Sequence, residues 1–362
     1  GVAYRNLGGL SEAREHHQQA LQLAREIKNR KWEGLNIGNL GSVYLYLAQY
    51  SEALAHYEQA LAIHREIRDK SYQGTWLVNL GLCYWNLNNY QQALAYFEQA
   101  LPILREIGDK SEEGRALGGI GLTYWTLGDY SKSLDHSEKA LKIAREIGNR
   151  SGEARHLAHI GNVYFSLGNY PKALQYEEKA AAIAQEIGDK FQQTAWLGNL
   201  GATYHVLGDY QKALDYYDQS LRITREVENA KDEAIFLGNI GLIHAEYADY
   251  PQALESFEQA MEIAKKIGDK SGQGYQLINF GELAFKMGDY AKSIEHYAKA
   301  LAIGKAIKEP VIIWQARAGL ALAYDKQGRY RDALTQFEKA TALIEGVRNS
   351  LLSTESRTSF QA

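Results

Sequence analysis

The chain has 362 residues, with 40 basic and 44 acidic side chains, a formal charge of −4 at pH 7 and a single cysteine. This balance argues against binding of nucleic acid through a basic surface, and one cysteine excludes an internal disulfide framework and fits a reducing compartment. No apolar stretch is long enough to span a membrane, and four prolines in the whole chain favour long helices. We therefore expect a mostly helical, cytoplasmic protein. Because the chain starts at Gly1 without a methionine or a signal peptide, we also expect it to be a piece of a longer protein.

The sequence repeats itself every 40 residues without insertion or deletion, and nine copies fit the chain. Similarity at a fixed period is typical of repeat architectures. We expect nine periods over residues 1–348, the first truncated in its first helix. The last period is atypical, because Pro310 interrupts the connection and Ala321 replaces a glycine. Residues 349–362 are expected to form a tail or linker. The columns that define the period are glycine at 1, 41, 81, 121, 161, 201, 241 and 281, and tyrosine at 50, 90, 130, 170, 210, 250, 290 and 330.

Each period is expected to form two antiparallel helices. Apolar residues in 197–207 recur every three or four positions and share one face of a helix, and those in 210–223 form the inner side of a second helix. Gly208 and Asp209 form the turn between them. We interpret the glycine column as the place where two helices approach closely. The second helix is expected to end near a glycine with a left-handed backbone, at 108, 148, 188 or 268.

One period carries, in order, Leu200, Gly201, Tyr204, Gly208, Tyr210, Ala213 and Tyr217. This order of columns resembles the tetratricopeptide repeat, whose usual period is about 34 residues. The 40-residue form, joined by segments such as EIGDKSEEG, resembles the repeats of kinesin light chains and of spindle-orientation adaptors. It also resembles bacterial regulators that bind peptides or response regulators. The resemblance implies an all-α, right-handed superhelical solenoid of antiparallel helix pairs, in which the first helices line a concave groove.

The C-terminal stretch ALIEGVRNSLLSTESRTSFQA (342–362) leaves the repeat pattern. It resembles the junction after which many cyanobacterial tetratricopeptide proteins continue into a caspase-like CHAT protease domain. That resemblance implies that the repeats serve as a sensing or substrate-recruiting arm.

One face of the first helices carries few charges. The columns represented by 195, 199, 202 and 206 point away from the packing stripe, and only six of their 32 residues in eight complete helices are charged. A solvated helix face would carry Glu and Lys there, so we interpret this face as a recessed ligand surface.

Asparagine recurs in one column of this face, at Asn39, Asn79, Asn199, Asn239 and Asn279, and His159 occupies the same column. Asparagine is disfavoured in helix interiors, and its amide can pair with both the C=O and the N–H of a peptide unit. In some tetratricopeptide proteins an asparagine ladder at this position holds the backbone of an extended peptide, and the resemblance implies this role here. The alternative is that each asparagine bonds to a neighbouring helix and fixes the angle between repeats.

A neighbouring column carries large rings at Trp85, Trp125 and Phe165, followed by His205, and Leu82 and Leu122 lie beside it. These side chains predict a groove with an apolar N-terminal half and a more polar C-terminal half. The alternative is that the rings only pack against the next repeat.

Two arginines share a column in adjacent repeats. Arg115 and Arg155 predict the pairing of a ligand carboxylate, with a surface ion pair as the alternative.

Motifs for chemistry are missing from the sequence. No metal-ligand spacing, nucleophile elbow, kinase motif or cofactor fingerprint occurs, so we expect no catalytic activity, no metal and no cofactor. The main hypothesis is a non-enzymatic scaffold that binds a protein or an extended peptide, and neither nucleic acid nor membrane. One alternative is the regulatory arm of a larger CHAT-type protease or signalling protein, in which the groove docks another domain of the same chain. A second alternative is a structural spacer or self-assembly module.

Overall fold

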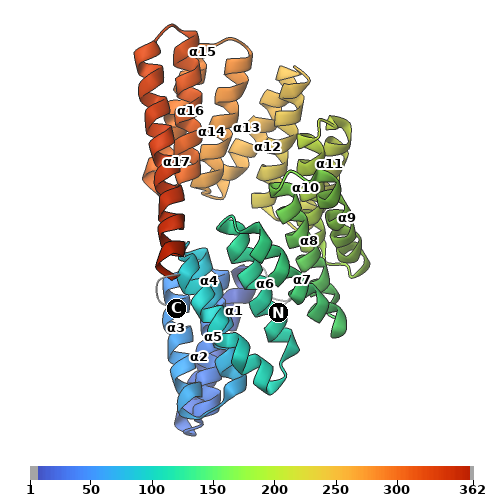
Figure 1. The fold of residues 1–362 in the computed structure, drawn as a ribbon, viewed down its shortest axis with the longest axis vertical. Coiled ribbons are helices and arrows are strands. Elements are labelled where there is room, and N and C mark those ends of the chain that lie inside the picture. The colour runs from blue at the N-terminus through green and yellow to red at the C-terminus, as the bar shows by residue number, and fades with distance from the viewer. Residues whose placement is uncertain (1–6, 359–362) are drawn as a thin grey trace. The chain divides into compact units, whose positions relative to one another are not determined.

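The computed structural model describes the backbone of residues 7–358 and the side chains of residues 9–346. Over these residues the chain forms seventeen α-helices and no strand, which confirms the all-α prediction (Figure 1). The first helices of the pairs, called A helices, are α2 (Arg30–Tyr46), α4 (Lys70–Asn86), α6 (Lys110–Thr126), α8 (Arg150–Ser166), α10 (Lys190–Val206), α12 (Ala230–Glu246), α14 (Lys270–Lys286) and α16 (Pro310–Lys326). The second helices, called B helices, are α1 (Leu7–Glu26), α3 (Tyr50–Glu66), α5 (Tyr90–Ile107), α7 (Tyr130–Glu146), α9 (Tyr170–Glu186), α11 (Tyr210–Glu226), α13 (Tyr250–Lys266), α15 (Tyr290–Ile307) and α17 (Tyr330–Thr358). The predicted truncation of the first A helix concerns residues at the start of the chain that lie outside the described ones.

The helices divide into two compact units, Gly1–Ile183 and Ala184–Ala362, with the boundary inside α9. In unit 1, α4 packs against its own partner α5 and against α3, the B helix of the preceding pair. In unit 2, α14 packs in the same way against α15 and α13. Neighbouring A helices also touch, as α4 does with α6 and α14 does with α16. Within each unit, a helix pair therefore buries its apolar faces against the next one, as a repeat array requires.

The turns between helices follow the local predictions. Gly208 has a φ of 77°, and the side chain of Asp209 accepts a hydrogen bond from the backbone N–H of Lys212 at 3.3 Å, which caps α11. The four glycines predicted to end B helices, at 108, 148, 188 and 268, all have a φ of 67–72°. This left-handed backbone lets the chain reverse at the end of one helix and begin the next within a few residues.

In most repeats the glycine column brings a ring of the B helix directly onto the backbone of its A helix, whereas Gly121 and Gly161 face Ser137 and Glu177 instead. A Cβ added at Gly241 would lie 2.5 Å from the Phe257 ring, and one added at Gly201 would lie 2.7 Å from the Tyr217 ring. Both rings are fully buried. These close contacts confirm the interpretation of the glycines as packing positions. Burying a side chain of this size contributes about 1.5–3 kcal/mol to stability.

A second contact, between neighbouring A helices, also needs glycine. A Cβ added at Gly198 in α10 would lie 2.6 Å from the ring of Phe236 in α12. The same offset of 38 residues brings together Gly38 and Trp76, Gly118 and His156, and Gly238 and Gln276. Where Val78 and Ile278 replace this glycine, the residues 38 positions further on are Ala116 and Ala316, whereas Ala158 is followed at that offset by Trp196. In each of these pairs, a glycine or alanine on one A helix is matched to a larger residue on the other.

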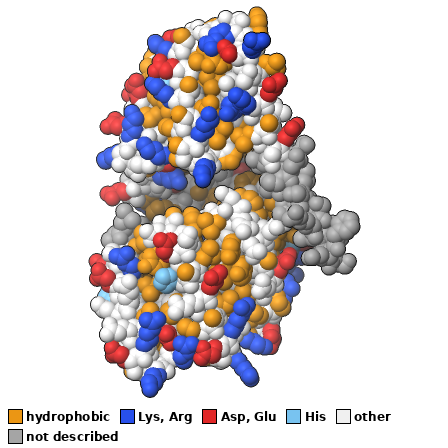
Figure 2. All heavy atoms as spheres, turned by 90° about the vertical axis from the view of Figure 1, so that its left-hand side faces the viewer, with side chains coloured by type: hydrophobic (Ala, Val, Ile, Leu, Met, Phe, Trp, Pro, Cys, Tyr) orange, Lys and Arg blue, Asp and Glu red, His pale blue; other side chains and the backbone are white. Residues whose placement is uncertain are grey.

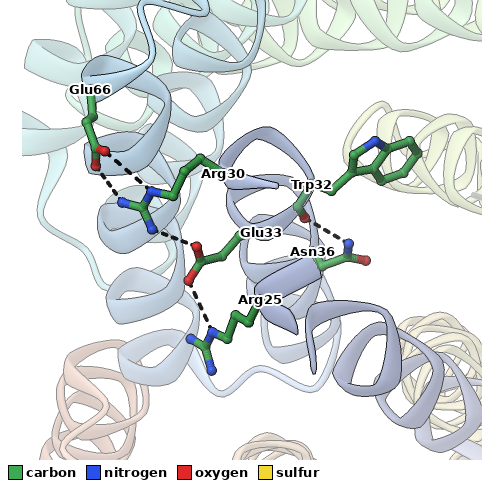
Figure 3. A network of polar contacts seen from close by, with 6 residues as sticks. All are labelled: Arg25, Arg30, Trp32, Glu33, Asn36 and Glu66. Carbon is green, nitrogen blue, oxygen red and sulfur yellow. Dashed lines mark hydrogen bonds and ion pairs between the residues drawn. The ribbon is translucent and has the colours of Figure 1, made fainter. Parts of the chain in front are cut away.

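At several junctions charged side chains connect the end of a B helix to the start of the next A helix, and Figure 3 shows the first of them. Glu33 in α2 accepts hydrogen bonds from Arg25 of the preceding α1 at 3.1 Å and from Arg30 at 2.6 Å. Arg30 also pairs with Glu66 at the end of α3. One carboxylate and one guanidinium therefore link three consecutive helices.

The same arrangement recurs around Glu113 at the start of α6. Burial by itself would raise the pKa of this carboxyl, but hydrogen bonds from Arg105 at 2.8 Å and Lys110 at 2.9 Å outweigh the burial. The pKa of Glu113 is therefore held below its ordinary value of 4.5. The ionised carboxylate stabilises the junction between α5 and α6.

The last helix exposes part of the surface that other B helices bury. Leu334 and Phe337 on α17 are 59% and 42% exposed, whereas Phe257, which occupies the column of Phe337, is covered by the next A helix. Figure 2 views the molecule from the left-hand side of Figure 1, where α17 lies, and shows hydrophobic side chains exposed among charged ones of both signs. The helix also continues past residue 348, so no helix end marks the predicted boundary between repeats and tail.

Replacing Gly198 by valine should lower the stability of the chain by about 1–3 kcal/mol, because the new side chain overlaps the Phe236 ring. In the double variant Gly198→Val/Phe236→Ala the loss should be smaller than the sum of the two single losses, because the alanine makes room for the valine. Urea unfolding followed by circular dichroism measures the three losses. Gly346→Ala is the control, since nothing lies within 4 Å of a Cβ at that position. Additive losses in the double variant would contradict the size-matched contact.

Replacing Glu113 by alanine should destabilise the chain in a pH-dependent way. Because the pKa of Glu113 is lowered in the folded state, its ion pairs contribute their full stability above the unfolded value of 4.5 and lose it as the pH falls through the folded pKa. The difference in urea midpoint between the original chain and Glu113→Ala should therefore be largest near pH 7 and shrink below pH 4.5. The exposed Glu98 provides the control variant Glu98→Ala, which should show little change at any pH. A difference that stays constant with pH would rule out the ionic contribution.

Candidate functional site

The residue columns interpreted as a ligand surface lie along a hollowed face of the A helices in unit 2. One hollow of about 460 Å³ is lined by α12 and α14 and reaches α16, and a second of about 420 Å³ lies between α14 and α16. Ile278, Glu282 and Gln315 line both hollows. The two hollows therefore adjoin at these residues, and together we call them the α12–α14–α16 recess.

The recess combines a few polar groups with a larger apolar surface. Its amides come from Asn239, Gln276, Asn279 and Gln315. Its apolar side chains include Ile235, Leu242 and Tyr275 in the larger hollow and Phe285, Trp314 and Leu322 in the smaller one. A concave surface with this mixture is typical of ligand-binding sites, in which apolar contacts supply affinity and polar groups fix orientation.

The asparagine column divides into members with and without an internal partner. Asn79 in unit 1 is buried and accepts a hydrogen bond from Arg115 Nη2 of the next A helix at 2.9 Å. Asn279 donates to Gln276 Oε1, one turn earlier in α14, at 3.1 Å. Among the described residues, no protein group hydrogen-bonds to the amide of Asn239, which faces the recess. The bond at Asn79 is the one expected if asparagine fixes neighbouring helices, whereas Asn239 is available to a ligand.

The remaining members of the asparagine column are half-buried. Asn39 lies on α2 and Asn199 on α10. His159 on α8 lies beside His156, with 6.1 Å between the ring centroids. Burial lowers the pKa of His156 to about 3 and that of His159 to about 4, so both rings are neutral at pH 7.

The two arginines predicted to pair a ligand carboxylate differ in their surroundings. Arg115 Nη1 lies 2.7 Å from both carboxylate oxygens of Glu112, and its Nη2 is the donor to Asn79. The guanidinium is therefore engaged in an ion pair with Glu112 and a hydrogen bond to Asn79. Arg155 is exposed on α8.

The ring column packs against its own protein as well as lining the A helices. Trp125 Nε1 donates to Ser166 Oγ of the next A helix at 2.9 Å. Phe165 and His205 each meet a tyrosine at the start of their own B helix edge-on, with centroid distances of 5.6 and 5.7 Å. Packing therefore accounts for part of this column, and half of each ring surface or less remains for a ligand. The other members of the predicted apolar half, Leu82, Trp85 and Leu122, are half-buried in unit 1.

The recess shares only Asn239 and Asn279 with the predicted set, and the lining residues absent from that set include Tyr275, Gln276, Glu282, Trp314 and Gln315. Tyr275 and Gln315 occupy the same column as Arg115, and Glu282 occupies the column of Leu82, so their positions in the repeat were available as a signal. Gln276 and Trp314 lie outside the four columns. Only the packing of α14 against α12 and α16 brings these two side chains to the surface of the recess.

The described residues offer neither a membrane-spanning helix nor a metal site. None of the described helices combines the length and the apolar character that crossing a membrane requires. Within the same residues, no cluster of three or more His, Cys, Asp or Glu side chains is arranged to hold a metal ion.

Comparison with known proteins places the repeats in context. A family model described as "Tetratricopeptide repeat" matches residues 1–66, 35–106, 72–146, 112–186, 192–266 and 276–345. No curated protein matches the sequence. Similar solved structures include the apo form of the quorum sensor NprR from B. thuringiensis, with a TM-score of 0.68 and 16% identity over 93% of this chain and 99% of that one.

Two more solved structures have a similar fold. A Rap protein complexed with Competence and Sporulation Factor has a TM-score of 0.66 and 16% identity over 94% of this chain and 96% of that one. A signal transduction ATPase with numerous domains (STAND) from Pyrococcus horikoshii, which carries a repeat sensor, has a TM-score of 0.60 and 18% identity over 94% of this chain and 54% of that one. At these identities the likeness concerns the fold alone.

The different surroundings of two asparagines predict different effects of the same substitution. Asn79→Ala should lower stability by about 1–3 kcal/mol, because it removes an acceptor from the Arg115 guanidinium in a buried position. Asn239→Ala should leave stability unchanged or raise it slightly, because no internal bond is lost and alanine favours the helix. Thermal unfolding of both variants provides the measurement. Equal losses at the two positions would contradict this division of the column.

Proposed function

Because the chain belongs to the tetratricopeptide repeat family, we propose that it is a non-enzymatic scaffold that binds a protein or an extended peptide on its A helices. The observation that carries this proposal is the α12–α14–α16 recess, a hollowed surface with free amide groups and exposed apolar side chains. The other sides of these helices are packed against B helices, so the recess is the part of the A helices that is open to a partner.

The chemistry of the recess fits an extended chain better than a compact small molecule. Each residue of an extended segment presents a C=O and an N–H, and burying them without partners costs about 1–3 kcal/mol per group. Asn239 and Gln315 have no internal partner among the described residues and lie on different A helices. They can therefore meet the backbone of one segment at successive points, while apolar side chains of that segment enter the hollows beside Ile235 and Trp314.

The rest of the predicted set belongs to the same proposal. Asn199 belongs to the unit 2 surface of the A helices, and Asn39, Trp85 and Trp125 belong to the corresponding surface of unit 1, to which the two rings would give an apolar character. Arg115 and Asn79 support the surface from within, because they bind each other.

The comparisons support a binding role. One similar structure is named as a quorum sensor, and another is a complex of a Rap protein with Competence and Sporulation Factor. A second candidate function is favoured by the STAND protein, in which the repeats are named a sensor and occupy part of a longer chain. On that view this chain is the sensing or recruiting arm of a larger protein, and the resemblance of 342–362 to the junction before a CHAT domain is its sequence counterpart.

Site-specific photocrosslinking tests the proposed surface. Tyr275 is replaced by the photoreactive aromatic benzoylphenylalanine, and the chain is irradiated in cells that express it. A discrete crosslinked product is expected, because position 275 lines the larger hollow. In the Asn239→Ala/Asn279→Ala background its yield should fall about tenfold, since losing hydrogen bonds to a bound backbone costs about 1.4 kcal/mol or more.

The control carries the photoreactive residue at Glu255, which is exposed on the B helix α13. No discrete product is expected there. Equal crosslinking at 255 and 275, or no product at 275, would overturn the assignment of the recess as the binding surface.

A further inference from the structure

Glu282 lies at the centre of the recess, since it is one of three residues that line both hollows. Its side chain is half-buried on α14. No Lys or Arg nitrogen of the described residues lies within 4.0 Å of its carboxylate, and no hydrogen-bond donor among them reaches it. The recess therefore has an unpaired negative charge where its two hollows meet.

The other charged groups along the recess are already satisfied or distant. Lys286, one turn after Glu282, is bound to Glu246 of α12 at 2.7 Å. Asp269 lines the larger hollow and accepts a hydrogen bond from the backbone N–H of Gly272, so it caps α14. Lys231 is near the start of α12, and the equivalent position on α14 is 271. Position 271 is eleven residues before Glu282, so the offset between the two levels is about 16 Å along the helix axis. None of these groups neutralises Glu282.

An unpaired carboxylate in a partly apolar depression becomes costly once a ligand covers it. Removing an ion from water without a partner costs several kcal/mol, whereas a well-placed cation with hydrogen bonds offsets that loss. A neutral or acidic segment lying across Glu282 would leave the charge buried and unpaired. A segment with one basic side chain at this point would not.

Apolar side chains lie on both sides of that charge. Ile235 and Leu242 line the larger hollow, and Trp314 and Leu322 line the smaller one. Side chains of a bound segment that flank its basic residue would therefore meet apolar surface on either side. The charge and the two hollows together describe a pattern of apolar, basic and apolar side chains.

We propose that the α12–α14–α16 recess selects an extended peptide segment in which one Arg or Lys lies between apolar side chains, with Glu282 as the counter-charge. This inference rests on the proposed function and specifies its partner. Arginine is expected to be favoured over lysine, because its planar guanidinium can bind a carboxylate through two parallel hydrogen bonds.

A random dodecapeptide display library, panned on the immobilised full chain, tests the inference. Peptides enriched on the original chain should share a basic residue flanked by apolar residues. On Glu282→Gln the affinity of these peptides should fall about tenfold or more, because a hydrogen-bonded charge pair is lost. On Glu282→Lys the selection should change to peptides with Asp or Glu at the central position.

The matched control is Glu255→Gln, the same change on the exposed face of the B helix α13, which should leave the selected peptides and their affinities unchanged. Circular dichroism of each variant confirms that the helices are intact. Enriched peptides without a basic residue, or a preference for Arg that survives Glu282→Gln, would overturn this inference and leave the binding scaffold standing. Failure to enrich any peptide on the original chain would overturn both.

Discussion

The close approach of neighbouring A helices is the constraint on which the rest of the structure depends. No helix pair buries its apolar surface alone, so each A helix must fit the one before it and the one after it. The fit is made by size: Gly238 leaves space for the amide of Gln276, which is buried against α12. At the next pair of A helices, Ile278 occupies the position equivalent to Gly238, and the residue 38 positions further on is the small Ala316. The recess results from this packing, because the same side chains that join α12, α14 and α16 also form its floor.

Charged side chains have different surroundings on the two sides of the A helices. At the junctions with B helices, ionised groups such as Glu33 and Glu113 pair with an arginine of the preceding helix. Where glutamine replaces the acid, as at Gln73 and Gln273, its amide donates to a carbonyl at the end of the preceding B helix, at 2.9 and 3.2 Å. The junction is thus satisfied with or without an ion pair. On the opposite face Lys286 pairs with Glu246, whereas Glu282 has no ion-pair partner among the described residues.

The periodic part of this architecture could be predicted from the sequence, because each repeated column has one physical cause. The helix pairs, the turn at Gly208 and the packing role of Gly241 all follow from the 40-residue period and the conformational freedom of glycine. The site could be predicted only in part. Asn79 and Asn239 share a column, and nothing local to either residue shows that the first is bound by Arg115 and the second is not. That difference arises from side chains 36 residues apart in sequence, which only the fold brings together.

Size matching along the A helices also restricts how such an array can grow by gene duplication. An in-frame duplication of residues 230–269 would place Gly238 against a second Phe236, which repeats the contact that Gly198 already makes. An in-frame duplication of residues 70–109 would place Val78 where a second Trp76 needs a glycine. Units of identical length are therefore not equivalent as material for expansion. The order of large and small residues at the contacts between A helices therefore determines which repeats can be neighbours.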